Sequence, residues 1–282
     1  DRTRLRRLRQ GPRRDRGLMP RPTGSGAVTV PPRGSQSASR AASVLLLLAE
    51  QRRTLSLTEI SQLLGVAKSS TRGVLVSLEA SGLIHRDDNE YGLAPTVLTL
   101  AAGYLQSDDI VRHFRRVVAQ LPVLAQEVVQ MGTLVERDVV FLARHAGRSP
   151  LAMTANVADR FPASITALGK ALLARLDDAE LRRRYPPGEP LPRWTDASVT
   201  TVEELMAQLE QVRADGFSRD QGETNPHVCG VAVALRGSRR SIGDLAVGAS
   251  LRPLVQAESH VAAVVQDLYR LRDELESHYL LE

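Results

Sequence analysis

Residues 55–82 read LSLTEISQLLGVAKSSTRGVLVSLEASG and carry the start and stop signals of two short helices. Ser56 can accept the backbone N–H of Glu59 while the Glu59 side chain reaches back, which is a capping box. Leu55 is placed to pack on Ile60 across this start. We therefore expect a helix over residues 57–64, ended by Gly65, because glycine tolerates the left-handed backbone of a helix terminus.

A second helix is predicted from about residue 68 to residue 80, with Gly82 after it. Val74, Leu75 and Leu78 lie on one stripe at helical spacing, as expected for a face packed on a core. The nearly continuous apolar run of residues 44–49 predicts a buried helix over residues 40–50.

Two short strand-like runs follow, at residues 83–86 and 90–93, around the turn sequence Asp87-Asp88-Asn89. Three helices, the last two joined tightly, followed by a hairpin predict a winged helix-turn-helix. The pattern alone leaves a small helical packing module as the alternative.

The rest of the chain alternates between helical and strand patterns. A connecting helix is expected over residues 96–106, and a longer one over 108–130 with a break at Pro122. Helices and strands then interleave, which predicts an α/β or α+β domain. The expected strands are 133–143, 217–220, 228–235 and 241–250; the expected helices are 164–176, 178–185, 201–215 and 253–281.

Motifs in both halves resemble the isocitrate-lyase-regulator (IclR) family of bacterial transcription factors. The matching stretches are Arg40-Ala41-Ala42, Leu57-Thr58-Glu59-Ile60, Lys68-Ser69-Ser70, residues 78–84, Phe161-Pro162-Ala163, residues 166–174, residues 216–223 and residues 241–250. The resemblance implies an α+β chain, with a mainly α winged helix-turn-helix at residues 35–94 and a linker helix at residues 95–107. A GAF-like α/β effector-binding domain at residues 108–282 would follow, and the protein would form homodimers or homotetramers.

The first turn of the second helix predicts contacts to double-stranded DNA. It offers hydroxyls and cations with no acidic residue nearby, which suits phosphates and base edges in the major groove; the candidates are Lys68, Ser69, Ser70, Thr71 and Arg72. We assign guanine readout to Arg72 and phosphate contact to Lys68, Ser69 and, near the wing, Arg86. The alternative is a solvated polar helix start and, for Arg86, a solvated turn. Relatives usually have Arg where this chain has Gly73, so operator sequences cannot be transferred from them.

By position in the family, the effector pocket would be lined by Phe161, Asp220, Gly230, Ala246 and Gly248. Relatives that bind small oxoacids commonly have two serines at the last two positions, and this chain has no hydroxyl there. We therefore expect a ligand larger or less polar than glyoxylate or pyruvate, aromatic or otherwise bulky. Asp220 would accept a hydrogen bond from the ligand or only cap a turn.

The positive charge of the chain is concentrated at one end. Residues 1–34 hold ten Arg and two Asp, a net charge of +8, so the remaining residues carry −3 of the total of +5. This Arg-rich tail is expected to be disordered and either adds non-specific DNA affinity or is a plain extension. Its paired arginines are not followed by an apolar stretch, so export is not expected, and no apolar run is long enough to span a membrane.

Nothing in the sequence favours an enzyme. The six histidines show no metal-ligand spacing, and no nucleophile elbow or phosphate loop is present. The single cysteine, Cys229, excludes an intramolecular disulfide and a cysteine-rich metal site, and the cytoplasm is the default location. We expect no cofactor, no metal and no catalytic residue. The sequence thus predicts a ligand-responsive DNA-binding regulator of the repressor type common in this family, which acts on a partly palindromic site. The alternative is a ligand-binding or protein-interaction module without specific DNA reading.

Overall fold

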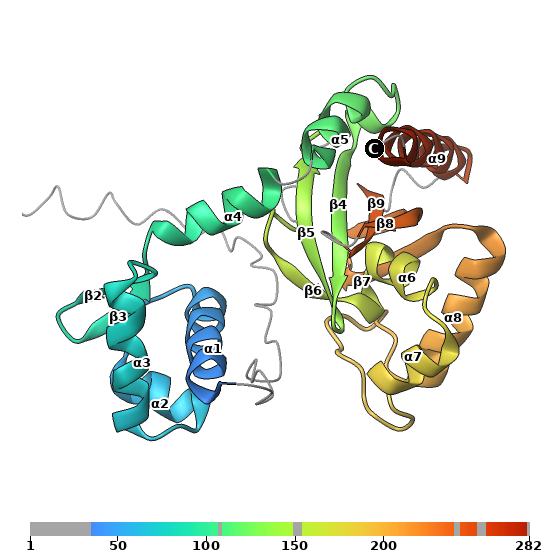
Figure 1. The fold of residues 1–282 in the computed structure, drawn as a ribbon. Coiled ribbons are helices and arrows are strands. Elements are labelled where there is room, and N and C mark those ends of the chain that lie inside the picture. The colour runs from blue at the N-terminus through green and yellow to red at the C-terminus, as the bar shows by residue number, and fades with distance from the viewer. Residues whose placement is uncertain (1–34, 107–108, 149–153, 240–242, 253–257, 281–282) are drawn as a thin grey trace, which may run out of the picture. The chain divides into compact units, whose positions relative to one another are not determined.

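The computed structural model describes residues 35–106, 109–148, 154–239, 243–252 and 258–280 (Figure 1). They form two compact units that divide between Asp109 and Ile110. The Arg-rich tail expected to be disordered lies outside the described residues. No helix in the described part of the chain combines the length and apolar character that crossing a membrane requires.

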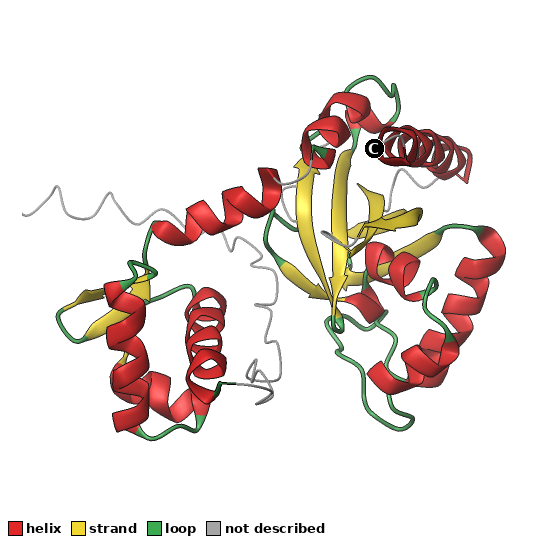
Figure 2. Ribbon diagram, in the orientation of Figure 1, coloured by secondary structure: helices red, strands yellow, loops and turns green. Residues whose placement is uncertain are grey.

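The N-terminal unit is a winged helix-turn-helix (Figure 2). It comprises α1 (Gln36–Gln51), β1 (Leu55–Ser56), α2 (Leu57–Leu64), α3 (Lys68–Ala80), β2 (Ile84–Asp87), β3 (Glu90–Leu93) and α4 (Thr96–Gln106). The strands form an antiparallel sheet in the order β1-β3-β2. Helices α1, α2 and α3 pack on this sheet around one apolar core. The core includes Leu48, Leu55, Ile60, Leu75 and Ile84.

The start and stop signals of α2 work as predicted. Ser56 accepts the Glu59 backbone N–H at 3.3 Å, and the Glu59 carboxylate accepts the Ser56 backbone N–H at 2.9 Å. These hydrogen bonds, together with one from Arg53, hold the pKa of Glu59 at about 2. Gly65 ends the helix at a φ of 62°, a conformation in which a side chain would be strained.

The C-terminal unit is a six-stranded antiparallel sheet with helices on both faces (Figures 1 and 2). Its strands are β4 (Val128–Val135), β5 (Asp138–His145), β6 (Arg160–Pro162), β7 (Ser218–Asn225), β8 (Val228–Arg239) and β9 (Gly243–Leu251), in the order β6-β5-β4-β9-β8-β7. Its α-helices are α5 (Ile110–Val118), α6 (Ala167–Leu173), α7 (Asp178–Arg184), α8 (Val202–Asp215) and α9 (Glu258–Leu280); two short 3-10 turns are η1 (Leu124–Gln126) and η2 (Ala163–Ile165).

The two faces of this sheet carry separate apolar cores. Val231, Val233 and Val247 pack with α5 and α9 on one face. Ala232 and Ala246, whose side chains point the other way, pack with α6, α7 and α8. The α+β fold class is therefore confirmed.

The predicted helix over residues 108–130 is wrong. α5 ends at Val118, four residues before Pro122, and β4 already begins at Val128. β4 lies between β5 and β9 and is buried on both faces over its first six residues. Such a strand shows no alternation, so its apolar run cannot be distinguished from a buried helix by pattern.

Two further segments, each expected to be continuous, are divided in the structure. The strand-like run of residues 133–143 belongs to two strands, separated by a turn at which Glu136 has a φ of 56°. The helix expected over residues 164–176 is divided at Thr166, whose extended backbone separates η2 from α6. Thr166 then caps α6, so the division gives that helix its start.

Candidate nucleic-acid interface and ligand pocket

The outer face of α3 gathers three of the predicted DNA contacts. Lys68, Ser69 and Arg72 are exposed, with no acidic residue in the first turn of the helix. The residue that precedes α3, Ala67, makes no side-chain cap, so the first backbone N–H groups of the helix remain available to a phosphate. The face thus combines fixed positive charge with helix-terminal donors.

Ser70 and Thr71, the other two predicted contacts on α3, are less accessible to DNA. Ser70 is half-buried, and Thr71 is buried against the core, where its hydroxyl donates to the carbonyl oxygen of Ala67 at 3.2 Å. A side chain held in this way cannot reach a base edge, so the structure removes Thr71 from the candidate contacts.

Arg86 lies on β2 of the wing and is exposed. Its guanidinium donates to the carbonyl oxygen of Asp88 at 2.8 Å and to Oδ1 of Asn89 at 3.3 Å, and lies 5.8 Å from the ring centre of Tyr91. These contacts hold the guanidinium on the hairpin, so a phosphate would have to share its donors.

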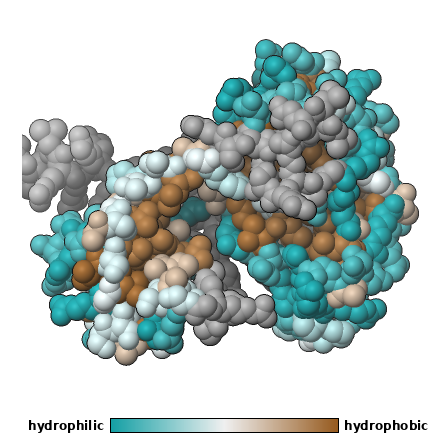
Figure 3. Space-filling model, viewed as in Figure 1, coloured by the Kyte–Doolittle hydropathy of each residue, from teal (hydrophilic) through white to brown (hydrophobic). Residues whose placement is uncertain are grey.

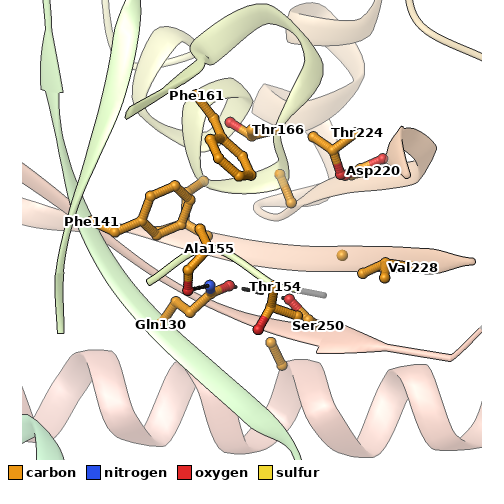
Figure 4. Close-up of a pocket in the computed structure, with 14 residues that line it drawn as sticks. Gln130, Phe141, Thr154, Ala155, Phe161, Thr166, Asp220, Thr224, Val228 and Ser250 are labelled. Carbon is orange, nitrogen blue, oxygen red and sulfur yellow. Dashed lines mark hydrogen bonds between the residues drawn. The ribbon is translucent and has the colours of Figure 1, made fainter. Parts of the chain in front are cut away.

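A cavity of about 40 Å³ lies in the C-terminal unit between the sheet and the start of α6 (Figure 4). Every strand of the sheet contributes to it, and the lining combines aromatic rings with hydroxyl, amide and carboxyl groups. The lining residues are Gln130, Phe141, Thr154, Ala155, Phe161, Thr166, Ala167, Leu168, Asp220, Thr224, Val228, Gly230, Ala249 and Ser250. One carboxyl group and no Lys or Arg is found among them.

Asp220 supplies that carboxyl group. It is 5% exposed, and it accepts the Glu223 backbone N–H at 2.6 Å and the Thr224 hydroxyl at 2.8 Å. Burial raises its pKa to about 6, because the loss of hydration outweighs the two hydrogen bonds. The side chain is therefore mostly ionised at neutral pH and can accept a further donor.

A second polar group in the wall is fixed across the sheet. The Gln130 amide donates to the carbonyl oxygen of Ala155 at 2.8 Å, and its oxygen accepts the Ser250 hydroxyl at 3.1 Å (Figure 4). Arg144 donates to the Thr154 hydroxyl at 3.2 Å, so a cation lies directly behind this wall.

A buried ion pair stands next to the pocket. Lys170 of α6 and Glu223 of β7 are 1% and 5% exposed at their side chains, and the ammonium group also donates to the Arg219 carbonyl oxygen at 3.3 Å. Because the Glu223 backbone donates to Asp220, the pair ties α6 to the turn that holds the pocket carboxylate.

Two family models match the chain: the bacterial transcriptional regulator IclR C-terminal domain over residues 102–273, and the IclR helix-turn-helix domain over residues 37–88. The chain belongs to the IclR family. It is 30% identical over 257 residues to the Pca regulon regulatory protein of Pseudomonas putida, covering 90% of this chain and 82% of that one. This family member is thus a DNA-binding transcriptional regulator, like its relatives, and not an enzyme.

Solved structures of IclR proteins share the fold of this regulator. The IclR regulator of Alicyclobacillus acidocaldarius gives a TM-score of 0.73 at 26% identity, covering 87% of this chain and 99% of that one. An IclR homologue of Microbacterium hydrocarbonoxydans, crystallised with 4-hydroxybenzoate, gives 0.67 at 20% identity, with coverage of 86% and 99%.

Three of the five residues predicted to bind an effector in this IclR regulator line the cavity: Phe161, Asp220 and Gly230. Ala246 and Gly248 do not. Ala246 is fully buried in the core under α6, and a Cβ at Gly248 would lie 2.8 Å from the Leu168 side chain. Gly248 thus allows α6 to pack closely on β9.

β9 offers the pocket a hydroxyl group at a position beyond the two that the family resemblance indicated, which carry none. Ser250 lies two residues beyond Gly248, on the same face of the strand, and lines the cavity. The alternation that placed Ala246 and Gly248 inward applies equally to Ser250, so extending it by one step would have found this residue. Gln130 was missed because it belongs to the strand taken for a helix.

Proposed function

We propose that this IclR-family protein is a ligand-responsive repressor that binds a partly palindromic operator as a homo-oligomer in the cytoplasm. The observation that carries the proposal is that each unit holds a different kind of binding surface. The N-terminal unit has the exposed cationic face of α3, and the C-terminal unit has a cavity lined by polar groups and aromatic rings. In the oligomer, ligand binding would favour one of two arrangements of the DNA-binding units, and residues 95–107 would transmit the change. This requires the ligand to bind the protein more tightly in one arrangement than in the other.

The surface of α4 supports the homo-oligomer. Leu98, Leu100 and Tyr104 are 71%, 60% and 40% exposed, and the helix holds no charged residue. Apolar surface is visible along this helix in Figure 3. Leu100 and Tyr104 lie on one side of the helix and Leu98 on nearly the opposite side. Exposed apolar side chains of this kind on a surface helix favour burial against a second copy. Two DNA-binding units related by symmetry would match half-sites one or more helical turns apart.

The chemistry of the cavity favours an uncharged ligand that carries a hydroxyl group, such as a phenol, over a small oxoacid. A ligand hydroxyl can donate to Asp220 and a ring can pack between Phe141 and Phe161, whereas a ligand carboxylate would find no cation in the wall. Since the cavity is only about 40 Å³, side chains of the wall must move to admit a ring. A carboxylate on the ligand would need Arg144 to turn away from Thr154.

Calorimetric titration tests this ligand class. We expect phenol, which has a ring and a hydroxyl group and no carboxylate, to bind more tightly than glyoxylate or pyruvate, and Asp220→Asn to weaken the binding of phenol. Micromolar binding of either small oxoacid at this pocket would contradict the assignment.

Footprinting tests the proposed mode of DNA reading. The purified protein is applied to the DNA upstream of its own gene and of neighbouring genes at two salt concentrations, with wild type and Arg72→Ala compared. We expect a defined protected site that survives moderate salt and is lost in the variant, since an arginine–guanine contact contributes roughly 1–3 kcal/mol of discrimination. Diffuse protection that salt erases equally in both proteins would instead favour an interaction module without specific reading.

A further inference from the structure

The outward side of α3 presents small residues where a DNA-reading helix usually carries long ones. Because successive residues are about 100° apart around a helix, Ser69, Gly73 and Val76 lie within about 60° of one another. The buried positions Thr71 and Leu78 lie on the opposite side. The side of α3 farthest from the core therefore carries no long side chain at these three positions, and Arg72 lies beside them.

Gly73 has no packing reason in the described structure. It is exposed in the interior of a thirteen-residue helix, and a Cβ built on it would meet nothing within 4 Å. Glycine at such a position weakens a helix relative to alanine. A bare, outward-facing helix backbone does, however, allow close approach of another molecule.

Val76 is the second unusual residue on this side. Its side chain is 59% exposed, and it lies one turn after Arg72 and two turns after Ser69 on the exposed side of α3. In the major groove the C5-methyl group of thymine is the apolar feature that a valine can contact. The partner that fits both the charge of Lys68 and Arg72 and this isolated apolar side chain is duplex DNA.

We propose that Gly73 and Val76 are specificity-determining residues of α3: Gly73 lets the helix backbone approach the base edges, and Val76 packs on a thymine methyl group. The inference rests on the proposed use of α3 as the reading helix. Arg72 and Val76 are one turn apart, about 6 Å along the axis, so each half-site should contain a guanine and a thymine within about two base pairs.

The first test changes the DNA and not the protein. Duplexes selected from a randomised library by the full-length chain serve as probes, and each thymine is replaced in turn by deoxyuracil, which lacks only the methyl group. We expect one replacement per half-site to weaken binding of the wild-type protein about fourfold, as for the loss of one buried methyl group. Val76→Ala should bind the thymine and uracil duplexes equally.

The second test separates DNA approach from helix stability. Gly73→Ala should raise the thermal midpoint of the protein, because alanine favours the helix and meets open space, and yet weaken binding to the selected duplex at least tenfold. Binding to a scrambled duplex of equal composition should change less than twofold. Val135→Ala, at an exposed valine of the C-terminal unit, is the control for loss of an exposed apolar side chain and should bind like wild type.

The outcomes distinguish this inference from the function on which it rests. If uracil replacement has no effect at any position, or if Gly73→Ala binds as tightly as wild type while Arg72→Ala is weakened, the roles of Gly73 and Val76 are wrong and α3 remains the reader. If Arg72→Ala is also unaffected, α3 does not read the operator.

Discussion

Among single residues, the buried carboxyl group of Asp220 gives the pocket a dependence on pH. Its pKa is raised from 3.8 to about 6 in the folded protein, so the folded state holds this proton more tightly than the unfolded chain. The stabilisation from that proton is complete below pH 3.8 and is lost as the pH rises through 6. A difference of this size corresponds to roughly 3 kcal/mol.

We expect the difference in unfolding free energy between wild type and Asp220→Asn to shift by up to roughly 3 kcal/mol between pH 4 and pH 7, in favour of the variant at the higher pH. The variant cannot ionise, so the subtraction isolates this group. Urea unfolding followed by fluorescence is the measurement, because the only tryptophan of the chain, Trp194, packs 5.0 Å from Phe161 beside the pocket. Parallel pH profiles for the two proteins would show that the carboxyl group is not perturbed.

The Lys170–Glu223 pair makes a second prediction for single residues. Removing one buried charge leaves the other without compensation, so Lys170→Met and Glu223→Gln should each lower the unfolding free energy by about 3–5 kcal/mol. The double variant Lys170→Met with Glu223→Gln should lose much less than the sum, because neither charge remains. Additive losses in a double-mutant cycle would mean that the two side chains do not depend on each other.

How far the sequence specifies the pocket depends on what each residue contributes. Phe161 and Asp220 stand in motifs whose position in the family is fixed, so they could be assigned to the cavity wall from the sequence. Gln130 could not, because its role requires β4 to lie next to β9 so that Ser250 can reach it. That neighbour relation is a long-range property of the sheet order, and no local pattern encodes it.

At the scale of whole elements, local signals determine the helices that begin and end in solvent. The capping box and Gly65 gave α2 its bounds, and the capping box of Thr201 and Glu204 likewise precedes α8. β4 fails this logic because it is buried on both faces between two partners. The very short strands β1 and β6 were also not foreseen, since two or three residues hold no period of their own.

α6 provides the prediction at this scale. All seven of its residues are buried, and the Thr166 hydroxyl accepts the Gly169 backbone N–H at 3.0 Å within that buried setting. Thr166→Ala should therefore cost about 1–2 kcal/mol of unfolding free energy, measured by the Trp194 fluorescence change in urea. Thr166→Ser keeps the accepting oxygen and should recover most of the loss; equal losses in the two variants would point to packing of the threonine methyl group instead.

For the whole molecule, the winged helix-turn-helix and the sheet domain each follow from their own sequence patterns and cores. The assembly of copies is a different question, because its energy comes from surfaces that a single chain leaves exposed. α4 is the element where that surface is concentrated, with Leu98 and Leu100 as its most exposed large apolar side chains.

We therefore expect Leu98→Glu combined with Leu100→Glu to weaken self-association at least tenfold. The two positions lie on nearly opposite sides of α4, so whichever side is buried against a second copy would then hold a carboxylate that loses its hydration. Sedimentation equilibrium measures the mass, and Val135→Glu in the C-terminal unit is the matched control for adding an exposed charge in place of an apolar side chain. Binding to a complete palindromic duplex should fall with the mass, whereas binding to a duplex holding one half-site should change less than twofold, because α3 itself is intact. If the double variant keeps the mass of the wild type, association uses another surface, and α4 would have to be exposed for a different reason.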